Sequence, residues 1–460
     1  MSVGLRCAAV LFAASRASTT ATYSPSESLP ADGTTAPADD QAAELELRGA
    51  FARFKRNFGK KYSGEREEKL RLRAFSVSKR SADDLNRATG AAVFGTNYFS
   101  DLLENESSVA APKGLILGNL SKFDDLKVAP MGALLLGPSA RGEAAADHLN
   151  RNLPPAIDWR LANVVTPVKT QGSCGACWAF SVAQEVESMY ALHVVGASME
   201  VFSPQQITSC APDGVGCGGG DPISGYTYLM EAEGLAQEVF WPFAGGLTPS
   251  LSCDAKSCTQ PCDAKDLAVM KKYSTLIGPY ARVTDASFAT PFCKDGLCQK
   301  QDLGRLAHAL VERGPIAIAV NAERWHQYAG GIMTFESCGG STMFDLDHAV
   351  QLVGFHTRAP VPYWIVRNTW STLWGEAGYI YLEYGRNTCG LANLATFPEV
   401  AAGRGGGPGQ HVRRLAESIE RAEQVDRLRR LAIGEGSSSQ VQEGRDRVER
   451  RRLENSDVLV

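Results

Sequence analysis

The chain has 460 residues, of which 44% are apolar and 21% charged, so it is long enough to bury a full core and long for a single domain. Its formal net charge of −4 gives no basic excess of the kind that attracts nucleic acid or anionic membranes. No stretch approaches the ~18 consecutive apolar residues of a membrane-spanning helix, so the sequence predicts neither a nucleic-acid partner nor a membrane span.

The N-terminal residues 1–17 have the pattern of a secretion signal. Arg6 precedes the short apolar stretch 7–14, and the small residues Ser15 and Ala17 suit a cleavage site. An unstructured or transit-type N-terminus is the alternative, because Ser, Thr and Ala are common there. We expect a signal peptide that leads to the secretory pathway, with a lysosome, a vacuole or the cell exterior as destination.

Residues 18–44 are rich in Ser, Thr, Ala, Pro and Asp and form a flexible lead. Two helices are expected next. The first carries apolar side chains at helical spacing and ends at Gly64, and the second, charge-laced helix runs from Arg66 to Asn86. The apolar set of the first helix is Leu45, Leu47, Phe51, Phe54, Phe58 and Tyr62. Residues 106–152, with Gly-Pro, Gly-Asn and Ala-rich stretches, form a connecting segment.

A long helix is expected to begin at Cys177, because apolar residues recur from Trp178 to Leu192 after a Gly-rich turn. A thiol attacks carbonyl groups as the thiolate, and the positive end of a helix dipole favours that anion. A buried structural cysteine is the alternative, but the turn-forming sequence before Cys177 indicates an exposed thiol.

The second half of the chain is richer in strand patterns, which cover 316–320, 349–353, 363–366 and 378–382. His348 lies at the start of one apolar run, and Asn368 follows another. An imidazolium near Cys177 would favour the thiolate, and Asn368 can hold the imidazole ring. Gln171 can supply an amide N–H where charge develops on the attacked oxygen.

Twelve cysteines indicate an oxidising compartment. Cys7 would leave with the signal, and Cys177 must stay reduced. Metal binding by the remaining cysteines is the alternative to disulfides, but their mixed spacing and the absence of a His cluster disfavour it. We therefore expect no metal and no cofactor.

Several motifs in this order resemble the papain and cathepsin family of cysteine peptidases over roughly residues 45–105 and 153–400. They are Gln171-Gly-Ser-Cys174-Gly-Ala-Cys177-Trp178, Cys217-Gly-Gly-Gly220, Gly330-Gly331-Ile332, Trp374-Gly-Glu-Ala-Gly-Tyr379 and Asn387-Thr-Cys389. The resemblance implies an α+β, papain-like two-lobe fold, in which a helical lobe and a β-barrel-like lobe enclose the active-site cleft. A small helical inhibitory prodomain would precede it.

The resemblance implies a role for each candidate residue. Cys177 would be the nucleophile, His348 the acid and base, and Asn368 the residue that orients His348. Gln171 would donate to the oxyanion, and Trp370 would shield the His–Asn hydrogen bond from water. Thr369 departs from the usual Ser.

The substrate is expected to be a protein or peptide. By the same resemblance, Gly219 and Gly220 would pair with it as an added strand. An apolar pocket for the second residue before the scissile bond would be lined by Pro222, Ala319, Leu346 and Leu394. Because no acid is seen at the pocket floor and no occluding loop is present, we expect an endopeptidase that prefers an apolar residue there.

Disulfides implied by the resemblance are Cys174–Cys217, Cys338–Cys389 and a bond of Cys210 with Cys253 or a near neighbour. Cys258, Cys262, Cys293 and Cys298 then remain for two further bridges in a Cys-rich insert at about 248–301. That insert accounts for the separation of His348 from Cys177, which exceeds the roughly 130–150 residues usual for the family.

Residues 45–105 resemble the family's inhibitory prodomain, through Glu67, Arg71, Phe75 and Asn86 and the Gly95-Thr-Asn97-Tyr-Phe99-Ser-Asp101 turn. Such a segment would lie through the cleft in the reverse direction and block Cys177. Acid would release it, because the carboxylates that hold it lose their charge.

The peptidase domain is expected at 153–401, followed by a Gly-rich linker and a charged tail at 402–460. An amphipathic stripe predicts a solvated helix in a dispensable tail, with trafficking or partner binding as alternatives. The sequence thus predicts a monomeric cysteine endopeptidase made as an acid-activated zymogen. The alternative is a catalytically weak inhibitor or scaffold protein that binds through its prodomain or Cys-rich insert.

Overall fold

The computed structural model describes residues 38–103, 106, 113–117, 126–129, 153–194, 197–232, 234–245, 281–402, 424–425 and 427–434. The expected signal peptide at 1–17 and most of the lead and the tail lie outside these residues. The chain divides into two compact units, residues 1–48 and 49–460. In the first unit the start of helix α1 (Ala38–Asn57) is described, and Arg48 Nε donates to Glu44 one turn earlier (2.7 Å).

The second unit begins with the rest of α1, which ends at Asn57, earlier than the predicted end at Gly64. Gly59 has a φ of 60°, and the Lys60 N–H donates to the Lys55 carbonyl (2.9 Å), which closes the last turn. Tyr62 lies beyond the helix, yet its ring stacks on Phe51 with centroids 5.9 Å apart. The apolar spacing therefore correctly indicated that these side chains pack together, but it predicted a helix that is too long.

Helix α2 (Glu65–Thr89) ends at Gly90, whose φ of 67° is left-handed. Phe75 is 1% exposed and its ring contacts both Phe51 and Phe54, with centroids 5.3 and 4.9 Å away. This aromatic cluster joins α2 to the part of α1 in the same unit.

The described strands form one sheet in the order β2-β8-β3-β5-β6-β7-β4, with β1 paired to β5. Their bounds are β1 (Ala156–Asp158), β2 (Ala281–Phe288), β3 (Ile316–Val320), β4 (Ile332–Met333), β5 (His348–His356), β6 (Tyr363–Arg367), β7 (Tyr379–Glu383) and β8 (Ala395–Ala402). Pairing is antiparallel except between β4 and β7.

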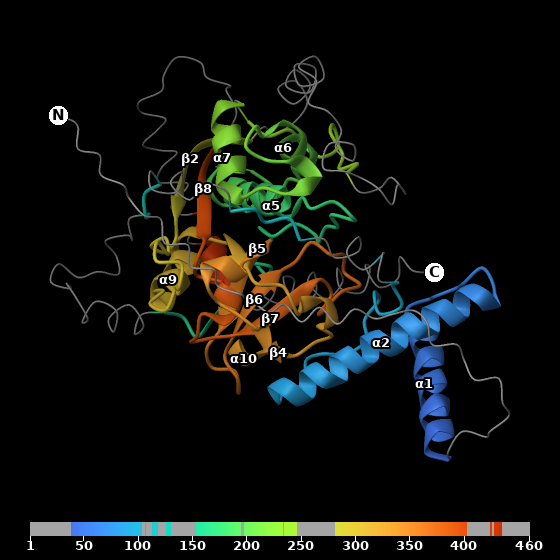
Figure 1. Ribbon diagram of the computed structural model, residues 1–460. Coiled ribbons are helices and arrows are strands. Elements are labelled where there is room, and N and C mark those ends of the chain that lie inside the picture. Colours follow the sequence, from blue (N-terminus) through green and yellow to red (C-terminus); the bar gives the residue numbers. More distant parts are fainter. Residues whose placement is uncertain are drawn as a thin grey trace, which may run out of the picture. The chain divides into compact units, whose positions relative to one another are not determined.

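The described helices of this part are α5 (Cys177–His193), α6 (Pro204–Cys210), α7 (Pro222–Glu231), α9 (Leu303–Arg313) and α10 (Phe335–Cys338), with 3₁₀ turns η2 (Gly216–Gly218), η3 (Trp325–Gln327), η4 (Met343–Asp345) and η5 (Thr388–Gly390). Figure 1 shows α5, α6 and α7 gathered on one side and β4, β5, β6 and β7 on the other. None of the described helices is both long and apolar enough to cross a membrane.

Helix α5 forms the centre of the core, and every residue from Cys177 to Leu192 is buried. A helix that is apolar on nearly all sides is stable only when it is enclosed. Two of its polar side chains are paired with the sheet: Gln351 Nε2 on β5 donates to Glu185 Oε2 (2.9 Å) and Ser188 Oγ (3.0 Å). The helix that begins at Cys177 is thereby fixed against the strand that begins at His348.

The predicted Cys-rich insert at 248–301 is too long at its C-terminal end. Residues 281–288 form strand β2, which pairs along its length with β8. Ala281, Val283, Ala286 and Phe288 are buried while the charged residues between them face outward, so β2 belongs to the core sheet. Residues 246–280 lie outside the described part of the chain.

Three disulfides join described residues: Cys174–Cys217, Cys293–Cys298 and Cys338–Cys389. Cys210 is also disulfide-bonded. Its expected partner Cys253, as well as Cys258 and Cys262, lies outside the described residues.

Candidate active site

Cys177 is held by the loop that precedes α5. The Cys174–Cys217 disulfide closes this loop, and the Gly175 N–H donates to the Cys217 carbonyl (2.9 Å). A Cβ atom at position 175 would lie 2.5 Å from that carbonyl oxygen, so only glycine fits. Cys177 is the one free cysteine among the described residues.

His348 is the first residue of β5, opposite Val320 of β3. Its Nε2 lies 2.8 Å from Asn368 Oδ1, and the same oxygen accepts the Thr369 N–H (2.8 Å). Because the Asn368 oxygen is the acceptor, His348 Nε2 carries the hydrogen and Nδ1 is the basic nitrogen. Nδ1 has no hydrogen-bond partner among the described residues.

The thiol lies at the start of β5. The backbone N–H groups of Ala349, the residue after His348, and of Gly114 and Trp178 are near enough to the Cys177 thiol to act against the rise of its pKa. The arrangement therefore brings a thiol, an imidazole with a free basic nitrogen, and an amide that orients it into one buried group, in which Cys177, His348 and Asn368 are each 0% exposed.

Tryptophans enclose the imidazole. The Trp370 ring stacks on His348 with centroids 4.8 Å apart, and Trp325 meets it edge-on at 6.1 Å. Trp374 lies edge-on to Trp370 at 5.2 Å. All three indoles are at most 1% exposed, so water has little access to the His348–Asn368 hydrogen bond.

Gln171 is joined to the strand end that carries Asn368. Its N–H donates to the Thr369 carbonyl (3.0 Å), and the Thr369 hydroxyl donates to Gln171 Oε1. Gln171 Nε2 donates to the Cys174 carbonyl (2.9 Å), which fixes the direction of the amide. The role of Thr369 escaped the sequence analysis, where this residue was noted only as a departure from Ser.

The cleft is covered by the described segment 113–117. The Gly114 carbonyl accepts the Gly220 N–H (2.9 Å), and the Ile116 N–H donates to the Gly220 carbonyl (2.8 Å). Between them the Leu115 N–H donates to the Asp347 carbonyl (3.2 Å), and Leu115 pairs with Gly220 in parallel. Gly114 also approaches Gly175, two residues before Cys177, since a Cβ atom at position 114 would lie 1.8 Å from the Gly175 carbonyl oxygen, and its backbone N–H acts on the pKa of the thiol, so this segment lies beside the thiol.

This arrangement differs from the prediction that residues 45–105 themselves lie through the cleft. The residues beside the thiol belong to the segment 106–152, which was expected to connect the prodomain to the peptidase domain and to carry the cleavage region. A Cβ atom at Gly114 would lie 1.8 Å from the Gly175 carbonyl oxygen, so the close approach depends on a glycine. The Gly-Leu-Ile-Leu run at 114–117 was the available signal for a paired extended segment.

Residues 45–105 anchor the covering segment instead. The Gly95 N–H donates to the Gln327 carbonyl (2.9 Å), and Asn97 Nδ2 donates to the carbonyls of His326 (2.7 Å) and Tyr328 (3.2 Å). Phe99 lies against the His326 ring, with centroids 6.4 Å apart.

The turn that ends at Asp101 is itself held by buried polar contacts. Asp101 accepts hydrogen bonds from Lys60 Nζ and Tyr62 Oη, each 2.9 Å long. Arg71 of α2 donates to the Asp101 carbonyl and pairs with Glu106. Burial alone would raise the pKa of Glu106, but hydrogen bonds from Arg71 and from the Leu103 N–H hold that pKa below its ordinary value.

Burial keeps the reactive groups neutral beneath the cover. It raises the pKa of the Cys177 thiol to about 11, although the backbone N–H donors oppose it. Burial also lowers the pKa of His348 to about 4, against the opposing effects of the Asn368 hydrogen bond and the Asp347 charge. Lys113, whose Nζ lies 2.7 Å from Asp347 Oδ2, adds a nearby positive charge that lowers it further.

The four residues predicted to line an apolar pocket are all buried: Pro222, Ala319, Leu346 and Leu394. The Ala319 N–H donates to the Leu394 carbonyl (2.9 Å), which joins two of them. Pro222 follows Gly220 by two residues and Leu346 precedes Asp347, and Leu115 is bonded between Gly220 and Asp347. Leu115 of the covering segment is partly buried, and its backbone contacts residues that are close in sequence to Pro222 and Leu346.

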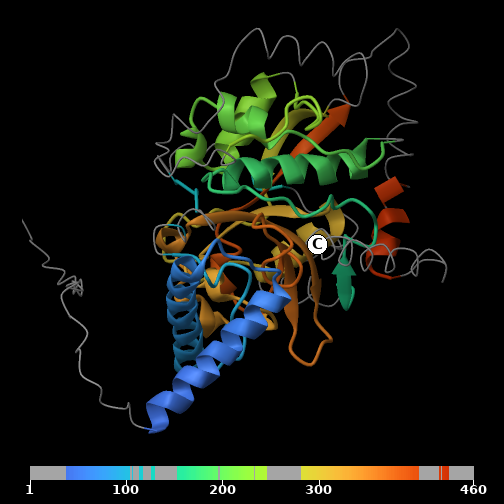
Figure 2. The same ribbon diagram turned by 90° about the vertical axis from the view of Figure 1, so that its right-hand side faces the viewer.

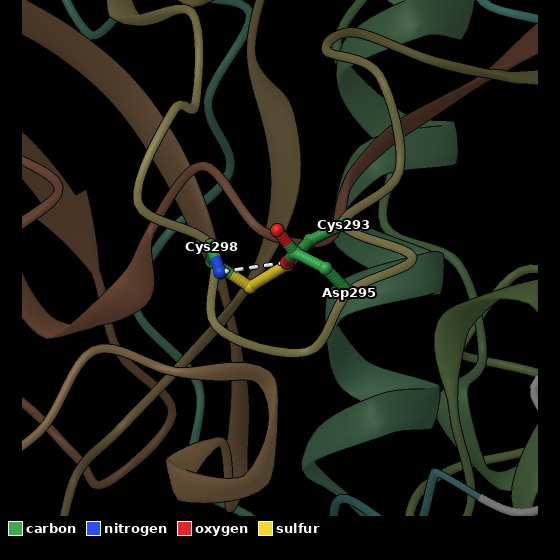
Figure 3. A group of neighbouring side chains, drawn as sticks. All are labelled: Cys293, Asp295 and Cys298. Carbon is green, nitrogen blue, oxygen red and sulfur yellow. Dashed lines mark hydrogen bonds between the residues drawn. A yellow bond between two sulfur atoms is a disulfide. The ribbon is translucent and has the colours of Figure 1, made fainter.

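Cys293, Asp295 and Cys298 are metal-ligand residue types within 4.8 Å of one another (Figure 3). Both sulfurs are used in a disulfide, so neither is a thiolate ligand. Asp295 Oδ1 accepts the N–H groups of Leu297 (3.0 Å) and Cys298 (3.1 Å), which stabilises the turn.

Comparisons with known proteins match two segments of the chain, the N-terminal helical segment and the domain that carries Cys177, His348 and Asn368. Residues 153–399 match the family described as "Papain family cysteine protease", and residues 51–107 match "Cathepsin propeptide inhibitor domain (I29)". A cysteine proteinase of Trypanosoma brucei brucei is 33% identical over 76% of this chain and 66% of its own length. Thiol protease aleurain of Arabidopsis thaliana is 30% identical over 76% of this chain and 84% of its own.

Solved structures share the fold. The recombinant stem bromelain precursor covers 77% of this chain and 98% of its own, with a TM-score of 0.56 and 24% identity. Digestive procathepsin L2 from the larval midgut of Tenebrio molitor covers 76% of this chain and 99% of its own, with a TM-score of 0.56 and 25% identity. These matches confirm the predicted α+β, papain-like fold preceded by a helical prodomain.

Proposed function

The chain belongs to the papain family of cysteine proteases, and from this premise we propose that it is an endopeptidase zymogen that works through Cys177, His348 and Asn368 and is activated by acid. The observation that carries the proposal is the pair of contacts that link the three residues. His348 Nε2 is 2.8 Å from Asn368 Oδ1, and the backbone N–H of Ala349, the residue after His348, is near enough to the Cys177 thiol to act on its pKa.

In the proposed reaction the Cys177 sulfur loses its proton to His348 Nδ1 and attacks the scissile carbonyl carbon. The oxyanion accepts hydrogen bonds from the Cys177 backbone N–H and from the Gln171 Nε2 amide group. His348 returns the proton to the leaving amine, and a water activated by His348 then releases the acyl group and restores the thiol. Asn368 keeps the Nδ1 side of the ring toward the sulfur throughout.

The proposed substrate is a protein or peptide with an apolar residue two positions before the cut. Gly220 offers both its N–H and its carbonyl to an extended chain, since both are used by Gly114 and Ile116 of the covering segment. Leu115, whose backbone pairs with Gly220 and Asp347, supports an apolar preference, because its side chain packs partly buried against the apolar core.

Acid activation is proposed to depend on histidines as well as carboxylates. His348 is buried and His326 is half-buried near Lys113. For both, burial is the main cause of a lowered pKa, and the Lys113 charge lowers the pKa further. A group with a lowered pKa stabilises the covered state above its ordinary value of 6.5 and withdraws that stability as pH falls. The covering segment should therefore loosen progressively below about pH 6.5.

The disulfides and the relatives support a proposed route through the secretory pathway, to a lysosome, a vacuole or the exterior. We propose that the enzyme acts as a monomer with its own prodomain as intramolecular inhibitor.

The test is labelling of the acidified, processed protein with a thiol-directed epoxide, followed by peptide mapping. Modification at Cys177 with matching loss of peptide hydrolysis is expected. A protein that processes normally but neither reacts nor hydrolyses peptides would instead be an inhibitor or scaffold, and the proposal would be wrong.

A further inference from the structure

A segment of the C-terminal tail lies against the peptidase domain. Residues 427–432 are helical, and the Ile433 N–H donates to the Arg429 carbonyl (3.0 Å) at the end of this helix. Figure 2 shows this red segment beside the end of α5 that is remote from Cys177. The prediction of a wholly solvated tail helix does not hold for this part of the tail.

Gln424 contacts the C-terminal end of α5. Its Nε2 donates to the carbonyls of Ala191 (2.9 Å), Leu192 (3.2 Å) and Val194 (3.3 Å). The last carbonyls of any helix lack donors within that helix, so an outside donor satisfies acceptors that would otherwise need water. A single amide group thus serves the exposed end of the central helix.

Arg429 makes the equivalent contact with α9. Its Nε donates to the Val311 carbonyl (2.9 Å), and its second guanidinium nitrogen donates to the Glu312 carbonyl (3.1 Å). A cation is also favoured at the negative end of a helix dipole. The ends of α5 and α9 are adjacent, since His193 Nε2 lies 3.2 Å from the Arg313 carbonyl.

Apolar contacts accompany these hydrogen bonds. Val425 is 8% exposed and Ala432 is 2% exposed, and Leu428, Leu431 and Ile433 pack partly buried against the core. Arg427 is exposed. The segment therefore has one face toward the domain and another toward solvent, as a docked helix requires.

We propose that residues 424–434 act as an intramolecular staple, which stays bound to the ends of α5 and α9 after the stretch 403–423 is cut. The occupant of this surface is the chain's own tail. Five backbone carbonyls at the ends of α5 and α9 accept hydrogen bonds from Gln424 and Arg429. The contact therefore depends on these tail residues and not on the stretch 403–423 that links them to the domain. Because α5 has 17 residues, at ~1.5 Å per residue its two ends lie roughly 25 Å apart, and the staple leaves the cleft accessible.

The experiment uses the full-length chain with Cys177→Ala, which prevents self-cleavage, and a recognition sequence for a sequence-specific protease inserted within residues 403–410. After cutting, the protein is passed over a gel-filtration column. We expect the tail fragment to elute with the domain. The double variant Gln424→Ala/Arg429→Ala should release it, with at least a tenfold weaker association, whereas Arg427→Ala on the solvent face should retain it.

Elution of each uncut variant at the position of the parent protein shows that it has folded. Separation of the tail from the parent after cutting would overturn the proposal, as would equal retention in the double variant. Since the protein is catalytically inactive, neither outcome depends on the proposed proteolysis.

Discussion

Lys113 of the covering segment forms an ion pair with Asp347, the residue next to His348, with 2.7 Å between Nζ and Oδ2. The inhibitory segment thus brings a positive charge to the imidazole that must itself become positive for a thiolate–imidazolium pair to form. The cover excludes substrate and also opposes the charged state of the site.

Replacement of the nucleophile tests the chemistry. Cys177→Ala should abolish peptide hydrolysis and self-processing while leaving the fold intact, because no other free thiol is found among the described residues. Hydrolysis of a fluorogenic peptide and circular dichroism are the measurements. Retained hydrolysis would falsify the mechanism.

His326→Gln should move propeptide release to lower pH. The imidazole of His326 is half-buried at the prodomain contact with a lowered pKa, so it destabilises the covered state as pH falls below about 6.5. Glutamine does not titrate and removes this effect. The midpoint pH of processing is followed by gel electrophoresis, with a downward shift of about half a pH unit expected, which corresponds to roughly 0.7 kcal/mol. His356→Gln, at the far end of β5, is the control, and an equal shift in both variants would contradict the role of His326.

Glu106→Gln should lower the free energy of unfolding of the zymogen at pH 7, and it should not make that free energy more sensitive to mild acid. The lowered pKa of Glu106 means that its pairing with Arg71 stabilises the fold above its ordinary pKa of 4.5 and is lost only as pH falls through the lowered value. Because the pair is partly exposed, we expect a loss of roughly 0.5–1 kcal/mol at pH 7. Thermal unfolding of the zymogen at pH 7 and pH 3 measures it.

Glu65→Gln is the matched control, since its partner Lys69 lies one turn away on the same helix and both are exposed. Destabilisation by Glu106→Gln that is as large at pH 3 as at pH 7 would show that the charge on Glu106 is not the cause.

Thr369→Val should lower kcat while leaving KM nearly unchanged. The hydroxyl of Thr369 donates to Gln171 Oε1 and so holds the amide that faces the oxyanion. Loss of one orienting hydrogen bond is worth about 1–1.5 kcal/mol, or roughly tenfold in kcat. Thr369→Ser should restore the rate. Steady-state kinetics decide the question, and an unimpaired Val variant would exclude this positioning role.

Leu394→Glu should change specificity at the second residue before the cut. Leu394 is buried beside Ala319, where a leucine side chain of the substrate gains roughly 1.5–3 kcal/mol on burial. An arginine there is desolvated without a counter-charge, at a cost on the order of several kcal/mol. The ratio of kcat/KM for paired Leu and Arg peptides should fall in the variant. Leu297→Glu, at an exposed position, should leave it unchanged, and a parent enzyme that prefers Arg would show that the pocket is misassigned.

Local pattern predicted the elements that carry the site better than those around it. The helix expected from Cys177 runs from Cys177 to His193, and the strand expected at 316–320 has those bounds. Both are rich in apolar residues and almost wholly buried, so their composition reports the core directly. Strand β2 was missed because a register shift between Val283 and Asp285 breaks the alternation of its apolar residues and because it adjoins the Cys-rich stretch.

Long-range contacts were the part that the sequence did not reveal. The bonds between Gly114 and Gly220, and between Leu115 and Asp347, are made by backbone atoms, which every residue carries. The hydroxyl of Thr369 reaches a residue that lies far away along the chain. Such contacts depend on which surfaces the tertiary fold brings together, and no local pattern encodes them.

A substitution at Gly114 is expected to displace the covering segment. An added methyl group at this position would meet the Gly175 carbonyl oxygen at 1.8 Å, and the segment cannot retreat without losing its bonds to Gly220. Under the proposed activation the mature enzyme would lack this residue, whereas its replacement should uncover the thiol in the zymogen before activation. Selection at this position is therefore expected to protect the producing cell rather than the activity.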